Sequence, residues 1–120
     1  MNNEINLIKA EKFSASIYVG LKIQNTGEIH SITAVENICQ KFCDDIGFCV
    51  TVTPTKYVYT DGWEQGAIVG IINYPRFPAS EQTLENRALL LATELMLGLE
   101  QKRVTIDSPN GTTMLTNPNI

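Results

Sequence analysis

Two kinds of hydrophobic spacing alternate along the chain, and their order constrains the fold more than any other feature. Residues 13–23 alternate between apolar and polar side chains, which is typical of a strand with one buried face. Residues 31–47 carry apolar side chains at positions i, i+3, i+4 and i+7, which predicts an amphipathic helix. Ser31 is a candidate N-cap for this helix, and Gly47 is a candidate C-terminal stop.

The second half of the chain repeats this alternation. Residues 48–60 again have a period of two, and Pro54 places this strand at a sheet edge or a bulge, because proline has no N–H for the ladder. Residues 66–74 are almost uniformly apolar, which predicts a central strand. A second helix is expected over 81–101, and a fourth strand over 102–107.

The resulting order, β-α-β-β-α-β, is the split βαβ, ferredoxin-like pattern of the α+β class. We therefore expect one domain over residues 1–120, with a core over about 13–107 and a four-stranded antiparallel sheet that carries both helices on one face. The segment 112–116 is a candidate for a short extra strand, and the N-terminus and the C-terminal tail are expected to be flexible. The open face of the sheet would present hydroxyls and aromatic rings, which suits an oligomer interface or a ligand.

Composition narrows the function. The chain is 43% hydrophobic and 18% charged, as in ordinary globular proteins. Its net charge is −4 and it has no cluster of Lys or Arg, so we expect no nucleic-acid partner. No segment is apolar enough to span a membrane, and the N-terminus lacks the features of a signal peptide, so a cytoplasmic protein is expected. Three cysteines and a single histidine, His30, make a disulfide framework, a metal site and histidine catalysis improbable.

The segment 57–66, "YVYTDGWEQG", combines a turn signal with unusual chemistry. Asp61-Gly62 predicts a hairpin turn, because glycine adopts the positive φ of tight turns. The turn is flanked by three aromatic residues and one carboxylate, namely Tyr57, Tyr59, Trp63 and Glu64. Beside such rings a carboxylate can bind a cation or act as a base. A carboxylate next to a turn is more often simply solvated, and on the residues alone both alternatives stay open.

Further candidate contacts lie on either side of this segment. Thr53 and Thr55 extend the row of hydroxyls on the face of Tyr57 and Tyr59, although such rows also serve cross-strand packing. In "NYPRFP" (73–78), Tyr74, Arg76 and Phe77 can close a pocket, or the segment can be a rigid connector between a strand and a helix.

The runs "FSASIYVGLK" and "FCVTVTPTKYVYTDGWEQGAIVGIINYPRFP", on a chain of this length and element order, resemble the small phage-encoded S-adenosylmethionine (SAM) lyases, formerly called SAM hydrolases. The similarity covers roughly residues 13–107. It implies a ferredoxin-like homotrimer with active sites between subunits, and cleavage of SAM into 5′-methylthioadenosine and homoserine lactone without metal or cofactor. Such an enzyme would act in the cytoplasm of an infected bacterium and deprive host methylation and restriction systems of their methyl donor.

The resemblance also implies roles for particular residues. Glu64 is the carboxylate that best matches the family's glutamate, and Tyr57 or Tyr59 matches its tyrosine. We take Glu64 and Tyr57 as the catalytic pair. The substrate-binding set is then Tyr59, Thr53, Thr55, Trp63, Tyr74 and Phe77.

A site without histidine or metal is compatible with this chemistry. A sulfonium is an excellent leaving group, and the substrate's own carboxylate can attack its γ-carbon, so orientation supplies most of the catalysis. Three alternatives stay open. The chain can be a trimeric nucleotide-binding protein of the same fold, an inhibitor of a host protein, or a SAM hydrolase that forms homoserine.

Overall fold

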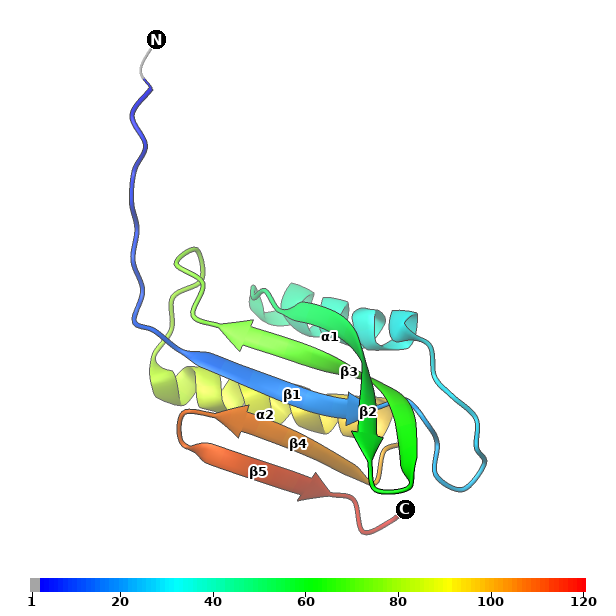
Figure 1. Cartoon of the computed structure of the whole chain (residues 1–120). Helices are drawn as coiled ribbons and strands as arrows, with labels where there is room; N and C mark the ends of the chain where they lie inside the picture. Colours follow the sequence, from blue (N-terminus) through cyan, green and yellow to red (C-terminus); the bar gives the residue numbers. More distant parts are fainter. Residues whose placement is uncertain (1–2) are drawn as a thin grey trace.

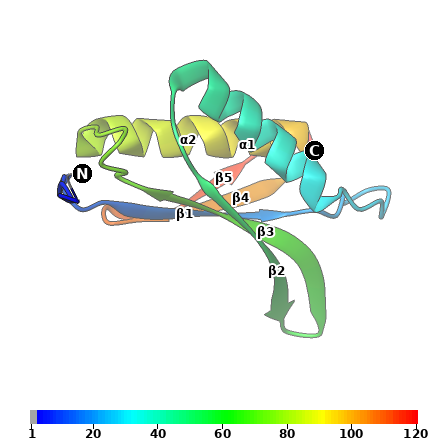
Figure 2. The ribbon, with the colours of Figure 1, turned by 90° about the horizontal axis from the view of Figure 1, so that it is seen from above.

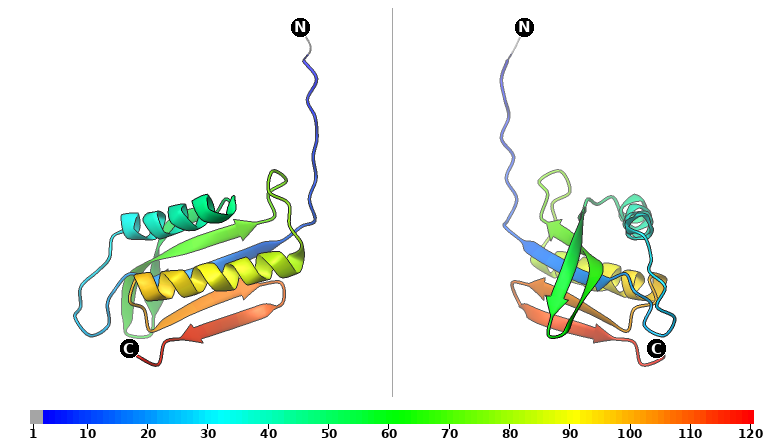
Figure 3. Two further views of the ribbon diagram at one scale, coloured as in Figure 1. Left: turned by 180° about the vertical axis from the view of Figure 1, so that it is seen from behind. Right: turned by 45° about the vertical axis from the view of Figure 1, so that its right-hand side comes forward.

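The computed structural model describes residues 3–120 and shows two layers, a five-stranded antiparallel sheet and two helices that cover one of its faces (Figure 1, Figure 3). The strand order is β2-β3-β1-β4-β5. The elements in chain order are β1 (Ser14–Gly20), α1 (Ile32–Ile46), β2 (Thr51–Tyr59), β3 (Gly62–Ile72), α2 (Glu81–Gly98), β4 (Arg103–Ser108) and β5 (Gly111–Thr116).

The prediction of a four-stranded sheet is wrong, because β5 adds a fifth strand. β5 pairs with β4 in a continuous ladder from Arg103 with Thr116 to Ser108 with Gly111. The chain can reverse between these strands because Gly111 adopts a φ of 132°, which residues with a side chain rarely adopt. The sheet therefore extends beyond the expected core of 13–107.

Both helices begin and end at capping residues. The Ser31 hydroxyl accepts a hydrogen bond from the Ala34 N–H, and the Ser80 hydroxyl accepts one from the Thr83 N–H. Gly47 ends α1 in the left-handed conformation, with φ 69°, and its N–H donates to the Cys43 carbonyl. The caps predicted at Ser31 and Gly47 are confirmed.

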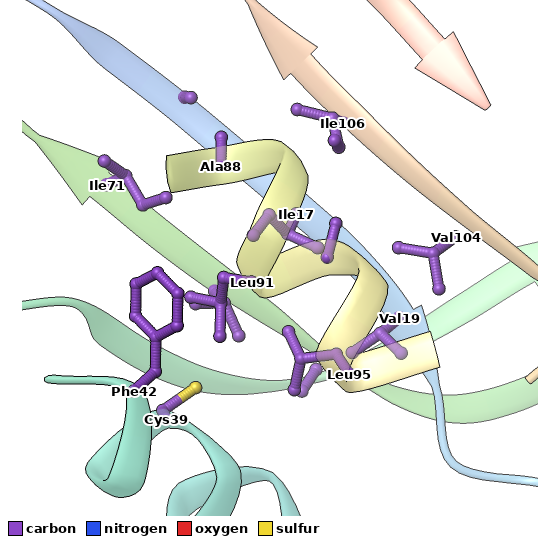
Figure 4. Close-up of a cluster of buried hydrophobic side chains, with 14 of the residues drawn as sticks. Ile17, Val19, Cys39, Phe42, Ile71, Ala88, Leu91, Leu95, Val104 and Ile106 are labelled. Carbon is purple, nitrogen blue, oxygen red and sulfur yellow. The ribbon is translucent and has the colours of Figure 1, made fainter. Parts of the chain in front are cut away.

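The core lies between the helices and the sheet (Figure 4). It is formed by alternate residues of the strands and by one stripe of each helix, among them Ile17, Val19, Ile71, Leu91, Leu95 and Val104. β2 lies at the edge of the sheet, as Pro54 predicts, and β3 lies between β2 and β1.

The β2–β3 hairpin extends past the other strands and bends away from the helices (Figure 2). Tyr59 pairs with Gly62, so the two turn residues are Thr60 and Asp61, and Asp61 has the positive φ of 60°. The predicted turn at Asp61-Gly62 is thus wrong by one residue. Gly62 is required for space instead, because a Cβ there would lie 2.6 Å from Cε2 of Tyr59.

The chain before β1 leaves the sheet in an extended path (Figure 1). The apolar side chains of Ile5, Leu7 and Ile8 in this segment are exposed. Within residues 3–120, no helix combines the length and the apolar character needed to cross a membrane.

Candidate active site at one end of the sheet

Three strand ends meet at one end of the sheet. β1 runs antiparallel to both β3 and β4, so the end of β1 lies beside the beginnings of the other two. They surround a pocket of about 360 Å³. Its lining residues are Lys22, Gln24, Tyr59, Glu64, Gln101, Lys102 and Arg103.

This pocket concentrates positive charge in a chain of net charge −4. Three cationic side chains, Lys22, Lys102 and Arg103, line it together with one carboxylate, that of Glu64. Within the described residues, the carboxylate of Glu64 takes part in no hydrogen bond and no salt bridge. An unpaired, half-buried carboxylate among cations is available to a ligand that carries both signs of charge.

Gly20, at the end of β1, has no side chain and lies beside two residues of the pocket, Gln101 and Glu64. A Cβ at this position would lie 2.9 Å from Oε1 of Gln101 and 3.3 Å from Oε1 of Glu64. The two oxygens thus come from different elements of the fold and approach the same space above Gly20.

Tyr57 lies on the same face of the sheet and pairs directly with Glu64. Its ring packs over Gly66, and its hydroxyl donates to the carbonyls of Ala67 (2.9 Å) and Val19 (3.2 Å). Burial raises the pKa of this hydroxyl to about 12. Tyr57 therefore stays protonated at neutral pH and serves as a hydrogen-bond donor, not as a base.

The other hairpin residues divide between the two faces of the sheet. Thr53, Thr55 and Tyr59 lie on the face of Glu64, because each pairs with β3 in the same phase as Tyr57. Trp63 lies on the opposite face, where its ring stacks with Nζ of Lys56 at 4.2 Å. Trp63 and Glu64 still line a second hollow of about 260 Å³, beside the first part of β3, which extends past its pairing with β1.

Tyr74 and Phe77 follow the opposite end of β3. A strand rises about 3.3 Å per residue, so they lie roughly 30 Å from Glu64 of the same chain. Phe77 packs against the core, and Arg76 lies over its ring at 5.4 Å. The structure therefore does not bring these two residues together with the pocket of their own chain.

Sequence reasoning missed five of the residues that line the pocket, namely Lys22, Gln24, Gln101, Lys102 and Arg103. A signal for some of them exists, because an antiparallel pairing of the first and fourth strands places the end of one beside the start of the other. The described residues contain no group of three or more His, Cys, Asp or Glu side chains that could hold a metal ion. Burial raises the pKa of the Cys39 thiol to about 12, which makes it unreactive.

The architecture and the pocket define a small α+β protein with a charged pocket at the end of its sheet. Comparison with solved structures identifies similar chains. A phage SAM lyase in complex with S-methyl-5′-thioadenosine superposes with a TM-score of 0.77 over 96% of this chain and 97% of that chain, at 17% identity. A phage SAM lyase in the apo state gives a TM-score of 0.67 at 20% identity, over 88% and 90% of the two chains.

The chain therefore has the fold of these phage SAM lyases, and the resemblance seen in the sequence is confirmed at the level of the fold. No family model matches the sequence, and the comparison with curated proteins finds no match.

Proposed function

We propose that this protein degrades SAM to 5′-methylthioadenosine and homoserine lactone. The observation that carries the proposal is the similarity of fold over nearly the whole of both chains to a lyase whose structure holds S-methyl-5′-thioadenosine, the adenosine product of this reaction. The pocket supports it, because an unpaired carboxylate and three cations suit the amino-acid end of SAM, which carries an ammonium and a carboxylate.

The reaction needs no group that the chain lacks. A carboxylate oxygen of the substrate attacks its own γ-carbon, and the bond between this carbon and the sulfonium sulfur breaks. The bonding electrons go to sulfur, which leaves as the neutral thioether of methylthioadenosine, and the lactone ring closes without proton transfer or water. The protein has to hold the attacking conformer and exclude water, an effect worth up to about 7–11 kcal/mol.

Each of the central side chains has a role in this scheme. Glu64 binds the substrate ammonium and so holds the methionine portion in place. Lys22, Lys102 and Arg103 attract the substrate carboxylate toward the pocket. Tyr57, opposite Glu64 in the ladder, offers the lone pairs of its hydroxyl oxygen and its ring face to the sulfonium, because an aromatic face attracts a cation.

The complete site is assembled by a neighbouring subunit in a homotrimer. A pocket of about 360 Å³ is at the small end of the range for ligand sites, so the adenosine portion needs additional surface. Val58 and Trp63 are exposed on the face of the hairpin opposite Glu64, as expected for side chains that a second subunit covers. Tyr74 and Phe77 would contact substrate only across such an interface, and light scattering tests the trimer directly.

The remaining substrate contacts are assigned to three residues on the open face of the sheet, Thr53, Thr55 and Tyr59. Trp63 borders the site from the opposite face of β3.

The biological role follows from the chemistry. In the cytoplasm of a phage-infected bacterium, removal of SAM deprives host methylation and restriction systems of their methyl donor.

Incubation of the purified protein with SAM in ¹⁸O-labelled water tests the proposal. We expect methylthioadenosine and homoserine lactone by chromatography, and homoserine from later opening of the lactone should have an unlabelled γ-hydroxyl. A labelled γ-hydroxyl would identify direct hydrolysis. Tight binding of SAM without any product would identify a binding protein, and absence of both binding and product would refute the proposal.

A further inference from the structure

The pocket contains a buried amide whose acceptor oxygen is unused. Gln101 is 7% exposed, and its Nε2 donates to the carbonyls of Lys22 (3.0 Å) and Leu99 (2.9 Å). These carbonyls can only accept, so the amide nitrogen must face them and Oε1 must face the other way. That direction is the pocket, which Gln101 lines.

The absent side chain of Gly20 lets this oxygen lie close to β1. Gly20 does not have a positive φ, so its backbone conformation does not require glycine. A Cβ there would instead lie 2.9 Å from Oε1 of Gln101 and 3.3 Å from Oε1 of Glu64. Glycine thus lets two acceptor oxygens from different elements approach the same point above the strand.

We propose that Gln101 Oε1 is a second acceptor for the α-ammonium of the substrate, which lies above Gly20 between Gln101 and Glu64. This inference rests on the proposed function. An ammonium has three N–H donors and forms hydrogen bonds of about 2.7–2.9 Å with charged partners, so two of its donors are satisfied by these oxygens. Gln101 is then a residue that selects substrates with an α-amino group.

The cationic side chains of the pocket do not bind the two acceptor oxygens of Gln101 and Glu64. Lys22, Lys102 and Arg103 line the same pocket, but within the described residues none of them donates a hydrogen bond to Gln101 or to Glu64. The two acceptors are therefore not used to hold the protein's own cations.

The test compares two substrates. SAM is paired with the S-adenosyl derivative of 4-(methylthio)butanoate, which lacks only the α-amino group and can still cyclise, to γ-butyrolactone. The ratio of kcat/KM for the two is measured in the wild type and in Gln101→Met, which keeps the length of the side chain but removes its polar atoms. Gln82→Met, at the far end of α2, is the matched control, because the Gln82 amide contacts only Asn86.

We expect Gln101→Met to lower the preference for SAM by about tenfold or more, as for loss of a hydrogen bond to a charged group. Gln82→Met should leave the preference unchanged. Because Gln101 also binds two backbone carbonyls, Gly20→Ala is the second variant. It retains the Gln101 side chain, but its methyl group would lie 2.9 Å from Gln101 Oε1 and 3.3 Å from Glu64 Oε1 and so displaces both acceptor oxygens; the preference should fall here as well.

The outcomes separate the two proposals. If the wild type converts SAM and neither variant changes the preference, the role of Gln101 is refuted while the proposed function stands. An equal loss of activity toward both substrates would show that Gln101 is only structural. If the wild type converts neither substrate, the proposed function fails and this inference fails with it.

Discussion

Among residues 3–120, two amide side chains are buried, those of Asn73 and Gln101; they lie at opposite ends of β3 and are used differently. Asn73, just past the end of β3, donates to the carbonyls of Glu11 (2.8 Å) and Ala79 (3.2 Å), and its Oδ1 accepts from the Ala79 N–H (3.1 Å). Gln101, beside the start of β3, uses both donors but leaves its acceptor open to the pocket.

This difference in hydrogen bonding distinguishes an amide that stabilises the fold from one that faces a candidate site. Burial of a polar group without a partner lowers the free energy of unfolding by about 1–3 kcal/mol. A polar atom that faces a pocket avoids this cost, because water or a ligand can satisfy it. The Asn73 amide uses its donors and its acceptor within the protein, whereas the end with Gln101 combines an acceptor oxygen that faces the pocket with an unpaired carboxylate. We therefore expect replacement of the Asn73 amide to change stability, and replacement of Glu64 or Gln101 to change turnover.

Asn73→Ala should produce the largest loss of stability. It removes three hydrogen bonds that connect the segment before β1 with the segment before α2, and should lower the free energy of unfolding by about 2–4 kcal/mol. Denaturant unfolding measures this loss, and turnover per folded molecule should stay at the wild-type level. A loss of turnover with unchanged stability would contradict the division between the two ends.

Tyr57→Phe should have a smaller effect on stability, about 1 kcal/mol, because it removes one hydroxyl that donates to the Ala67 and Val19 carbonyls. Its effect on turnover should exceed that of Tyr59→Phe, since Tyr57 pairs with Glu64 and is the more buried of the two. Steady-state kinetics of both variants check this. The reverse order would assign the catalytic role to Tyr59.

Of these three changes, a rise in pH should have the smallest effect on stability in the pH range where the protein works. The pKa of Tyr57 is raised from its ordinary value of 10.0 to about 12, mainly by burial, so the unfolded chain loses this proton first. The contribution to stability is complete below about pH 10 and is lost as the pH rises toward about 12. Denaturant unfolding of Tyr57→Phe should show a shallower decline across this interval, and an identical decline would exclude Tyr57 as its source.

Hydrophobic spacing in the sequence is sufficient to predict both helices and the first four strands, because each buries one face or stripe against the same core. β5 is harder to predict, since its residues are mostly exposed and it is held by pairing with β4. Gly62 misled the turn prediction, because glycine there makes room for the ring of Tyr59 instead of supplying a positive φ.

The pocket could be predicted only in part. Tyr57 and Glu64 stand out because aromatic rings and a carboxylate flank one turn, and the period of two already separates Trp63 from Glu64. The role of Gln101 has no local signal, because it depends on contacts of its amide with Lys22 and Leu99 and on the space above Gly20. Such a residue can be recognised only from the structure, which shows the strand ends side by side.

Turnover of SAM by Glu64→Gln is the most direct test of the account. The change keeps the shape of the side chain and removes its charge, so loss of a charge-assisted contact with the substrate should cost about 2–5 kcal/mol, or at least ~30-fold in rate. The melting temperature should stay almost unchanged, because the Glu64 carboxylate has no hydrogen bond or salt bridge within the described residues. Wild-type turnover in Glu64→Gln would contradict the account and leave Glu64 as a solvated residue beside a turn.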